Sequence, residues 1–250
     1  LDNSIFLAYW RAKKTKEIGI GFKIFKYLSK NKKFMGVVGI ANNLLNYHKW
    51  QGFRVGRLNH HFIKNENYNL PIFIKKKFFT QSNEKQIKID YINSSNIFKK
   101  VKEDIFRYQF PKKSKKYIVN RYINNPFYRY KIFKITCLGE AVLFIIRIVE
   151  IKKTRILKLV DFLGKQENIK NCGKFFKFVL NKYDAEYLDF YSFGIKEKYL
   201  LKAGFINRYL TSLILPNHFE PFKLKNININ YAFKFNSKKD LKKYLSKIRI

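Results

Sequence analysis

Acidic residues and cysteines are scarce in this chain of 250 residues. There are 17 Asp and Glu against 53 Lys and Arg, which gives a formal net charge of +36 at pH 7. The two cysteines, Cys137 and Cys172, show neither metal-ligand spacing nor a disulfide framework. The sequence therefore excludes a disulfide-stapled secreted protein, predicts no metal site, and favours a reducing, cytoplasmic compartment.

Long hydrophobic runs are also lacking. The apolar stretch 141–146 is interrupted by Arg147 and falls far short of the about 18 apolar residues that a membrane-spanning helix needs. The chain begins at Leu1 without Met, a charged leader or a cleavage site. We therefore expect no transmembrane segment, and we interpret the chain as a fragment that lacks its natural N-terminus.

Apolar material, by contrast, is ample. The chain is 46% hydrophobic and 18% aromatic, which excludes an intrinsically disordered protein despite the charge. Lys, Ile, Asn, Phe and Tyr are enriched together, as in proteins from A/T-rich genomes, so much of the basic charge is compositional. Nonspecific attraction to polyanions is nevertheless expected, because the acidic residues are too few to neutralise the basic ones.

Strand-like and helix-like stretches alternate along the chain, which predicts an α/β (α+β) fold with mixed sheets flanked by helices. The expected strands are 4–12, 35–40, 55–63, 141–151, 155–163, 187–193, 212–215 and 227–235. The expected helices begin at Ile20 or cover 41–51, 174–180 and 196–203, with another between 96 and 110. The strands 141–151 and 155–163 are joined so closely that they should form an antiparallel hairpin.

Three regions follow from this pattern. Residues 1–66 and 131–250 each have the alternating pattern of a domain, and the first of them is expected to lack its N-terminal strands. Residues 67–130 contain lysine runs separated by prolines, which predicts a basic connecting region.

The segment Lys16-Glu17-Ile18-Gly19-Ile20-Gly21 lies between an expected strand and an expected helix. Glycines there allow close backbone approach, and free amides at the start of a helix can bind a pyrophosphate. Two glycines alone would also fit a plain strand-to-helix turn.

This segment resembles the acyl-coenzyme A loop of the GCN5-related N-acetyltransferase superfamily. Downstream, the sequence from Gly39 through Tyr47 to Gly52 and Phe53 resembles the next element of that family, a strand, a helix that carries Tyr, and a closing Gly-Phe. The resemblance implies that an acyl-CoA, such as acetyl-CoA, binds at residues Lys16, Ile18, Gly19, Ile20, Gly21 and Phe22.

A similar order recurs in the second half, where Gly194-Ile195 precedes an expected helix and Gly204-Phe205 closes it. The second copy has no G-x-G loop in 164–171. Two such copies resemble the double acetyltransferase-like folds of FemAB-type aminoacyltransferases and of proteins found with bacterial surface-polysaccharide genes.

The resemblance implies acyl transfer from a thioester to an amine or hydroxyl of a small or sugar-linked acceptor. Such a reaction needs a base for the nucleophile and an acid for the departing thiolate. The candidates are Tyr47, His60, His61, Glu150 and Asp161, with His218 as a candidate acceptor-site residue. The alternatives are a core aromatic for Tyr47, structural histidines, and ion pairing for the two carboxylates.

Two other functions stay open. A basic RNA-binding protein of the organellar ribosomal type would explain the charge and the interleaved aromatics Tyr117, Tyr122, Phe127, Tyr128 and Tyr130. Against it, the basic residues are spread along the chain and no RNA-recognition signature is present. An inactive binding module with an acyltransferase-like fold is the third reading, because fold does not imply function.

Overall fold

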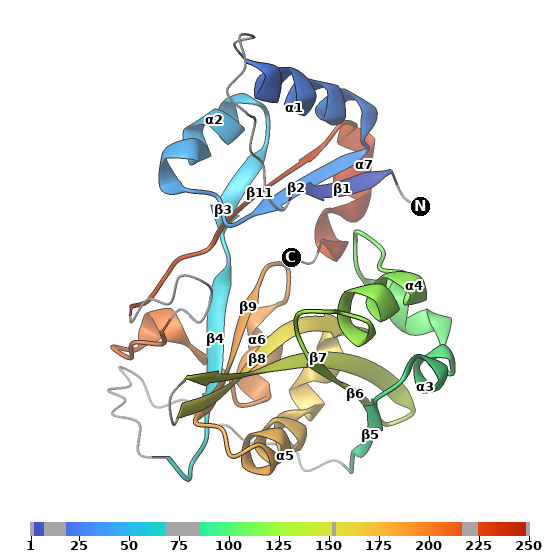
Figure 1. Ribbon diagram of the computed structural model, residues 1–250, viewed down its shortest axis with the longest axis vertical. Coiled ribbons are helices and arrows are strands. Elements are labelled where there is room, and N and C mark those ends of the chain that lie inside the picture. The colour runs from blue at the N-terminus through green and yellow to red at the C-terminus, as the bar shows by residue number, and fades with distance from the viewer. Residues whose placement is uncertain (1–2, 8–18, 69–85, 152–153, 217–224, 249–250) are drawn as a thin grey trace. The chain divides into compact units, whose positions relative to one another are not determined.

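The computed structural model describes residues 3–7, 19–68, 86–151, 154–216 and 225–248. The chain divides into two compact units (Figure 1). Unit 1 comprises Leu1–Leu58 with Ile227–Ile248, and unit 2 comprises Asn59–Asn226 with Arg249–Ile250. This division differs from the predicted boundaries at 66 and 130, and the strand pairing described below explains why.

Unit 1 contains a sheet with the strand order β1-β2-β11-β3. Its strands are β1 (Ser4–Leu7), β2 (Phe34–Val38), β3 (Arg54–Arg57) and β11 (Asn230–Phe235). Its helices are α1 (Ile20–Asn31), α2 (Leu45–Trp50) and α7 (Lys238–Tyr244), with short 3-10 turns at Asn42–Leu44 and Leu245–Lys247. Strands β1 and β2 run parallel, whereas β11 is antiparallel to both β2 and β3.

The two faces of this sheet are covered differently. Phe25 of α1 is buried against Met35, Ala232 and Phe53, so α1 packs on one face. Aromatic rings cover the opposite face, where Phe34 contacts Phe6, Phe233 and Phe235, and the ring of Tyr244 from α7 stacks on Phe235. A side chain at Gly36 would overlap the ring of Phe6, so glycine there admits this packing.

Unit 2 contains a sheet with the order β10-β4-β9-β8-β7-β6-β5. Its strands are β4 (Asn59–Lys64), β5 (Lys88–Ile92), β6 (Tyr130–Cys137), β7 (Glu140–Ile151), β8 (Thr154–Leu163), β9 (Tyr187–Ser192) and β10 (Ile206–Asn207). Its helices are α3 (Ser95–Lys99), α4 (Lys115–Ile118), α5 (Gly173–Lys182) and α6 (Glu197–Lys202). Shorter 3-10 or π segments cover Glu103–Tyr108, Val119–Ile123, Gln166–Asn171 and Arg208–Leu210. The pair β8–β9 is parallel, and the other neighbouring strands pair antiparallel.

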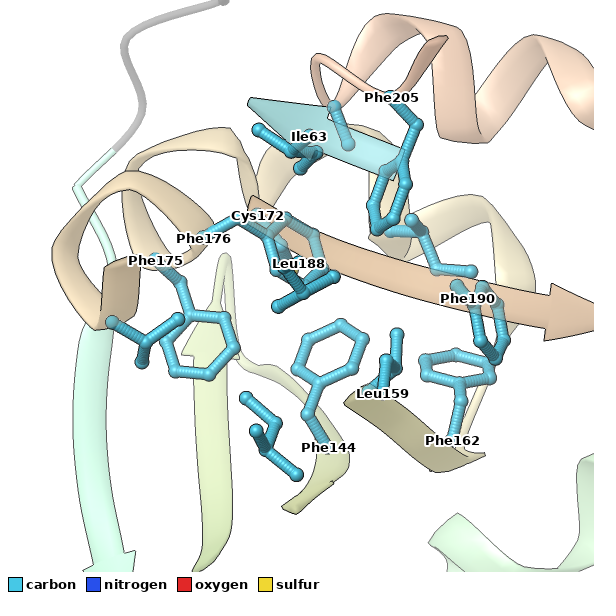
Figure 2. Close-up of a cluster of buried hydrophobic side chains, with 14 of the residues drawn as sticks. Ile63, Phe144, Leu159, Phe162, Cys172, Phe175, Phe176, Leu188, Phe190 and Phe205 are labelled. Carbon is cyan, nitrogen blue, oxygen red and sulfur yellow. The ribbon is translucent and has the colours of Figure 1, made fainter. Parts of the chain in front are cut away.

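A large apolar core lies between this sheet and α5 (Figure 2). Phe144 of β7 is fully buried, and its ring centroid lies 5.2 Å from that of Phe175 and 5.0 Å from that of Phe176. The alternation along β7 sends Leu143 and Ile145 to a second cluster with α3 and α4. The central strands are therefore buried on both faces, as their near-continuous hydrophobic sequence requires.

The two halves of the sequence exchange one strand each. Both contain the same order of strand, helix, parallel strand, helix and strand: β1-α1-β2-α2-β3 in unit 1 and β8-α5-β9-α6-β10 in unit 2. Strand β4 follows β3 in the chain but pairs between β9 and β10. Strand β11, which lies beyond β10 in the chain, pairs between β2 and β3. Each sheet is thus completed by a strand from the other half of the sequence.

This exchange accounts for most differences from the sequence predictions. The expected strand 55–63 is two strands that separate at Leu58 into different sheets, and 227–235 contributes β11 to unit 1. The connecting region contributes β5, α3 and α4 to unit 2, because β5 pairs with β6. Residues 212–215 form no strand. Of the expected strand 4–12, residues 8–12 lie outside the described residues.

The other elements confirm the predicted fold class, an α/β fold with mixed sheets flanked by helices. The hairpin of β7 and β8 is antiparallel as expected, with Ile151 opposite Thr154 at its turn. The helices expected from Ile20 and over 174–180 are α1 and α5.

Phe144→Ala should destabilise unit 2 by about 3–5 kcal/mol, because truncating a fully buried ring leaves a cavity. Urea unfolding, followed by circular dichroism, measures this loss. Phe178→Ala is the matched control, since Phe178 lies on α5 but is 42% exposed, and its effect should stay within about 0.5 kcal/mol. Equal losses in both variants would contradict the described core.

Candidate functional site

The start of α1 carries the described part of the predicted acyl-CoA loop. Lys16 and Ile18 lie outside the described residues, whereas Gly19, Ile20, Gly21 and Phe22 are described. Gly19 precedes the helix in the left-handed conformation, with φ 83°, and a side chain there would meet nothing within 4 Å. Among the described residues, no side chain caps α1, and its first turn holds no acidic residue. The first amides of the helix therefore fit an anionic group.

The equivalent position in unit 2 is closed. There α5 is preceded by the 3-10 segment Gln166–Asn171 and by the buried Cys172. A side chain at Gly173 would lie 3.3 Å from the carbonyl oxygen of Ala203, so the chain is tightly packed at this helix start. The two copies thus differ structurally where the sequence differs.

Tyr47, the candidate acid, lies on α2 in unit 1. Its half-buried ring packs near Phe25, at 6.2 Å between centroids, and near Trp50, at 6.4 Å. Burial raises the pKa of the Tyr47 phenol above its ordinary value of 10.0. The phenol therefore stays protonated at neutral pH and could give a proton to a departing thiolate.

His60 and His61 lie side by side on β4 in unit 2 and face opposite sides of the sheet, as residues that alternate along a strand must. His60 Nε2 lies 3.2 Å from Oδ2 of Asp189, and His61 Nε2 lies 3.2 Å from Oε1 of Glu197. Both imidazoles are 1% exposed. Asp189 comes from β9 and Glu197 from α6, so each face of β4 is tied to a different element.

A buried lysine completes the arrangement around His60. Lys158 of β8 donates from Nζ to the same Oδ2 of Asp189 at 2.8 Å, and the ring of Tyr191 stacks on the imidazole with centroids 3.9 Å apart. Burial alone would raise the pKa of Asp189, but attraction to Lys158 and the hydrogen bond from His60 hold it at about 2. Asp189 is therefore ionised at neutral pH and can only accept hydrogen bonds.

Both histidines are neutral at pH 7. Burial is the main cause that lowers their pKa values below 6.5, although Asp189 and Glu197 partly oppose it. Because an ionised carboxylate cannot donate, Nε2 of His60 carries the proton and Nδ1 keeps its lone pair. Among the described residues, neither His60 nor His61 has a hydrogen-bond partner for Nδ1. Such an imidazole can act as a proton acceptor.

Glu150 and Asp161 are in ion pairs, as the alternative reading of the sequence expected. Glu150 accepts a hydrogen bond from Nε of Arg155 at 2.7 Å on the surface of the β7–β8 hairpin. Asp161 is buried, and its carboxylate accepts from Lys113 Nζ at 2.6 Å and from the hydroxyl of Tyr122 at 2.7 Å. These bonds anchor the region before β6 to β8. His218 lies outside the described residues.

The parallel strands β8 and β9 pair over only three residues, from Leu157 opposite Leu188 to Leu159 opposite Phe190. Just beyond, the register between β7 and β8 shifts, so that Val160 is an extra residue on β8. Strand β8 then continues to Leu163 without a described partner on its β9 side. Lys158 and Asp189 form the middle one of the three pairs, next to this divergence.

Sequence reasoning singled out both histidines as candidates but not Lys158, Asp189 and Glu197, which contact them or one another. The signal was present, because Lys158 and Asp189 are each flanked by apolar residues in central strands. A charge in such a position is expected to be paired. In the described residues, no group of three or more His, Cys, Asp and Glu could hold a metal ion. No helix in the described part of the chain is long and apolar enough to cross a membrane.

No protein-family model matches the chain, and no curated protein matches it. Among solved structures, the chain is similar to a functionally unknown conserved protein from Staphylococcus epidermidis, with 15% identity, a TM-score of 0.50, and coverage of 88% of this chain and 79% of that chain. It is also similar to a GCN5-related N-acetyltransferase from Anabaena variabilis, with 8% identity and a TM-score of 0.48, covering 88% of this chain and 51% of that chain. A GCN5-related N-acetyltransferase from Sphaerobacter thermophilus has 9% identity and a TM-score of 0.40, with coverage of 93% and 73%. This chain thus spans about half the length of the Anabaena protein. At 15% identity, the likeness to the Staphylococcus epidermidis protein is a similarity of fold alone.

Asp189→Asn should destabilise unit 2 by about 3–5 kcal/mol, because it leaves the Lys158 ammonium buried without this carboxylate. Urea unfolding measures the effect. Asp90→Asn is the control, since Asp90 pairs with Lys88 and Lys134 but is 34% exposed, and should cost less than about 1 kcal/mol. Similar losses in the two variants would argue against the buried network.

The free energy of unfolding should fall as the pH decreases from about 7 to about 5, because histidines with a lowered pKa bind protons in the unfolded chain before they do in the folded one. Urea unfolding at the two pH values measures this change. The double variant His60→Gln, His61→Gln lacks both imidazoles and should show a smaller change. If it shows the full change, the two histidines are not responsible.

Proposed function

We propose that the chain is an acyltransferase that moves an acyl group from an acyl-CoA, such as acetyl-CoA, to an amine or hydroxyl of a small or sugar-linked acceptor. One observation carries the proposal. In the parallel β1-α1-β2 unit, the helix begins inside the G-x-G segment, after a left-handed Gly19 and with no acidic residue in its first turn. This arrangement suits the phosphates of a coenzyme A, which need backbone donors and room for close approach.

The cationic residues of α1 support the same ligand. Lys23 and Lys26 lie on exposed turns of the helix after Gly21, and Phe22 is 40% exposed beside the first turn. A phosphate at the helix start would therefore meet positive charge from both the amides and these side chains. The described part of unit 2 offers no equivalent, since its α5 start is packed against Ala203.

The repeat of elements in unit 2 supports a tandem arrangement of two GCN5-related N-acetyltransferase-like domains, with the donor site in the first. We place the protein in the cytoplasm, and a role in envelope or surface-polysaccharide synthesis rests on the sequence resemblance. An inactive binding module remains the alternative within this fold, and turnover distinguishes it.

In the proposed reaction, the acceptor amine or hydroxyl attacks the thioester carbonyl and loses a proton, while the carbon–sulfur bond breaks and the thiolate gains one. The protonated phenol of Tyr47 is the proposed donor to the thiolate. His60 and His61 belong to unit 2, face opposite sides of its sheet and are each 1% exposed, so they are assigned no common role with Tyr47 in this step. Glu150 and Asp161 are assigned no part in proton transfer, since both are engaged in ion pairs.

Gly21→Glu tests the donor site. Gly21 is the second residue of α1, where the helix dipole favours a carboxylate by about 0.3–1 kcal/mol, so the variant should fold. The new charge should repel the coenzyme phosphates. Calorimetric titration of acetyl-CoA at moderate salt should show affinity reduced by at least about tenfold, on the order of one charge-assisted hydrogen bond.

Gly21→Gln is the matched control, because it has nearly the same size without the charge, and it should bind more tightly than Gly21→Glu. Binding that is equal in the two variants, or that disappears in moderate salt as for any polyanion, would remove the acyl-donor site from α1. Saturable binding with no transfer to any amine or hydroxyl acceptor would favour the inactive module.

A further inference from the structure

One stretch of unit 2 is basic without any acidic residue. Residues 105–139 contain nine Lys and Arg and no Asp or Glu. Arginine is otherwise rare in this lysine-rich chain, yet Arg107, Arg121 and Arg129 fall within these residues. Arginine is the residue better suited to hold phosphate and to stack on aromatic rings. This concentration is therefore not explained by the general enrichment in lysine.

Four tyrosines from the same stretch form a continuous group of rings. The centroids of Tyr117 and Tyr122 are 6.4 Å apart, those of Tyr122 and Tyr130 are 5.0 Å apart, and those of Tyr130 and Tyr128 are 6.3 Å apart. Tyr122 is buried and donates its hydroxyl hydrogen bond to Asp161, which anchors the group to β8. Tyr117 and Tyr128 are 44% and 43% exposed. The group is thus anchored by the buried Tyr122, whereas the rings of Tyr117 and Tyr128 are exposed to solvent.

Arginine side chains accompany these rings. The guanidinium carbon of Arg147 lies 3.9 Å from the centroid of Tyr128, a stacked cation–π contact. Burial raises the pKa of Tyr130, and the charges of Arg121 and Arg147 partly oppose this rise. We call the exposed residues Tyr117, Arg121, Phe127 and Tyr128, together with the half-buried Arg147, the aromatic–arginine surface.

The backbone turn that carries Phe127 is stabilised by the side chain of Asn125. The side-chain oxygen of Asn125 accepts from the backbone N–H groups of Phe127 and Tyr128, at 3.0 and 2.8 Å. Its side-chain nitrogen donates to the carbonyl of Arg121 at 3.0 Å. Phe127 is nevertheless 84% exposed. Three hydrogen bonds fix the backbone that presents the ring, and the ring itself gains no burial within the described residues of the chain.

We propose that the aromatic–arginine surface binds the unpaired bases of a single-stranded nucleic acid. Exposed rings offer flat faces for bases, and arginines beside them meet the phosphates, which is the combination that single-strand binding uses. A duplex keeps its bases stacked on one another and cannot use the rings. The absence of acidic residues in 105–139 suits a polyanion. This binding is separate from the proposed acyl transfer and does not depend on it.

Fluorescence anisotropy with labelled 12-residue oligouridylate and oligothymidylate at physiological salt tests the proposal on the full chain. Phe127→Ala removes an exposed ring without opening the core and should weaken binding by about fivefold or more, which is the lower end expected for one stacked base. Arg121→Gln should weaken binding and lower the slope of log affinity against log salt by about one. The ratio of the two affinities tells whether RNA or DNA is preferred.

Phe178→Ala is the matched control, because Phe178 is an exposed ring in the same unit with Lys182 lying 5.5 Å above it. It should leave binding unchanged. The proposal is overturned if Phe127→Ala behaves like this control, or if a duplex or inorganic polyphosphate of matched charge binds as tightly as the single strand. It is also overturned if Phe127→Ala reduces binding to anionic lipid vesicles but not to the oligonucleotides, since the surface would then recognise a membrane.

Discussion

The structure depends on two strands, β4 and β11, that each pair into a sheet formed mainly by the other half of the sequence. Strand β4 is antiparallel to β9 over six residues, and β11 is antiparallel to β2 over five. Buried backbone groups must be paired, so each sheet is incomplete without a strand from the other half of the sequence. The pieces 1–66 and 131–250, which look like domains in the sequence, could not each close their sheet.

The polar groups buried around β4 also fix its register. Carboxylates are available on both faces, Asp189 for His60 and Glu197 for His61. A slip of one residue would send each histidine to the opposite face, together with every apolar side chain of the strand. At least one of the two carboxylates would then lose its histidine, although Asp189 would keep its hydrogen bond from Lys158 of β8. The two histidine–carboxylate pairs therefore favour the observed register of β4. The same arrangement leaves Nδ1 of each histidine without a hydrogen-bond partner among the described residues.

Local elements could be predicted from the sequence because their signals are local. The period of α1, the stop at Gly204 after α6, and the short β7–β8 turn each lie within a few residues. The exchange of strands could not be predicted, since pairing of β4 with β9 joins residues more than 120 positions apart, and hydrophobic pattern does not name a partner. For the same reason the sequence suggested His60 and His61 but not Asp189 or Lys158, whose roles appear only when β4, β8 and β9 are adjacent.

The net charge of +36 explains attraction but not selection. Charge attraction between exposed groups is screened beyond about 8 Å at physiological salt, so a diffuse excess of lysine favours any polyanion equally. Selectivity must come from short-range groups, and the two units differ in these. Unit 1 presents backbone amides without a side-chain cap after a left-handed Gly19, and we propose that they donate hydrogen bonds to a phosphate. Unit 2 presents an exposed Phe127 in a turn that Asn125 ties to the backbone of Arg121, and we propose that this ring stacks on a base. If both proposed sites bind their ligands, contact geometry and not total charge decides which anion each unit holds.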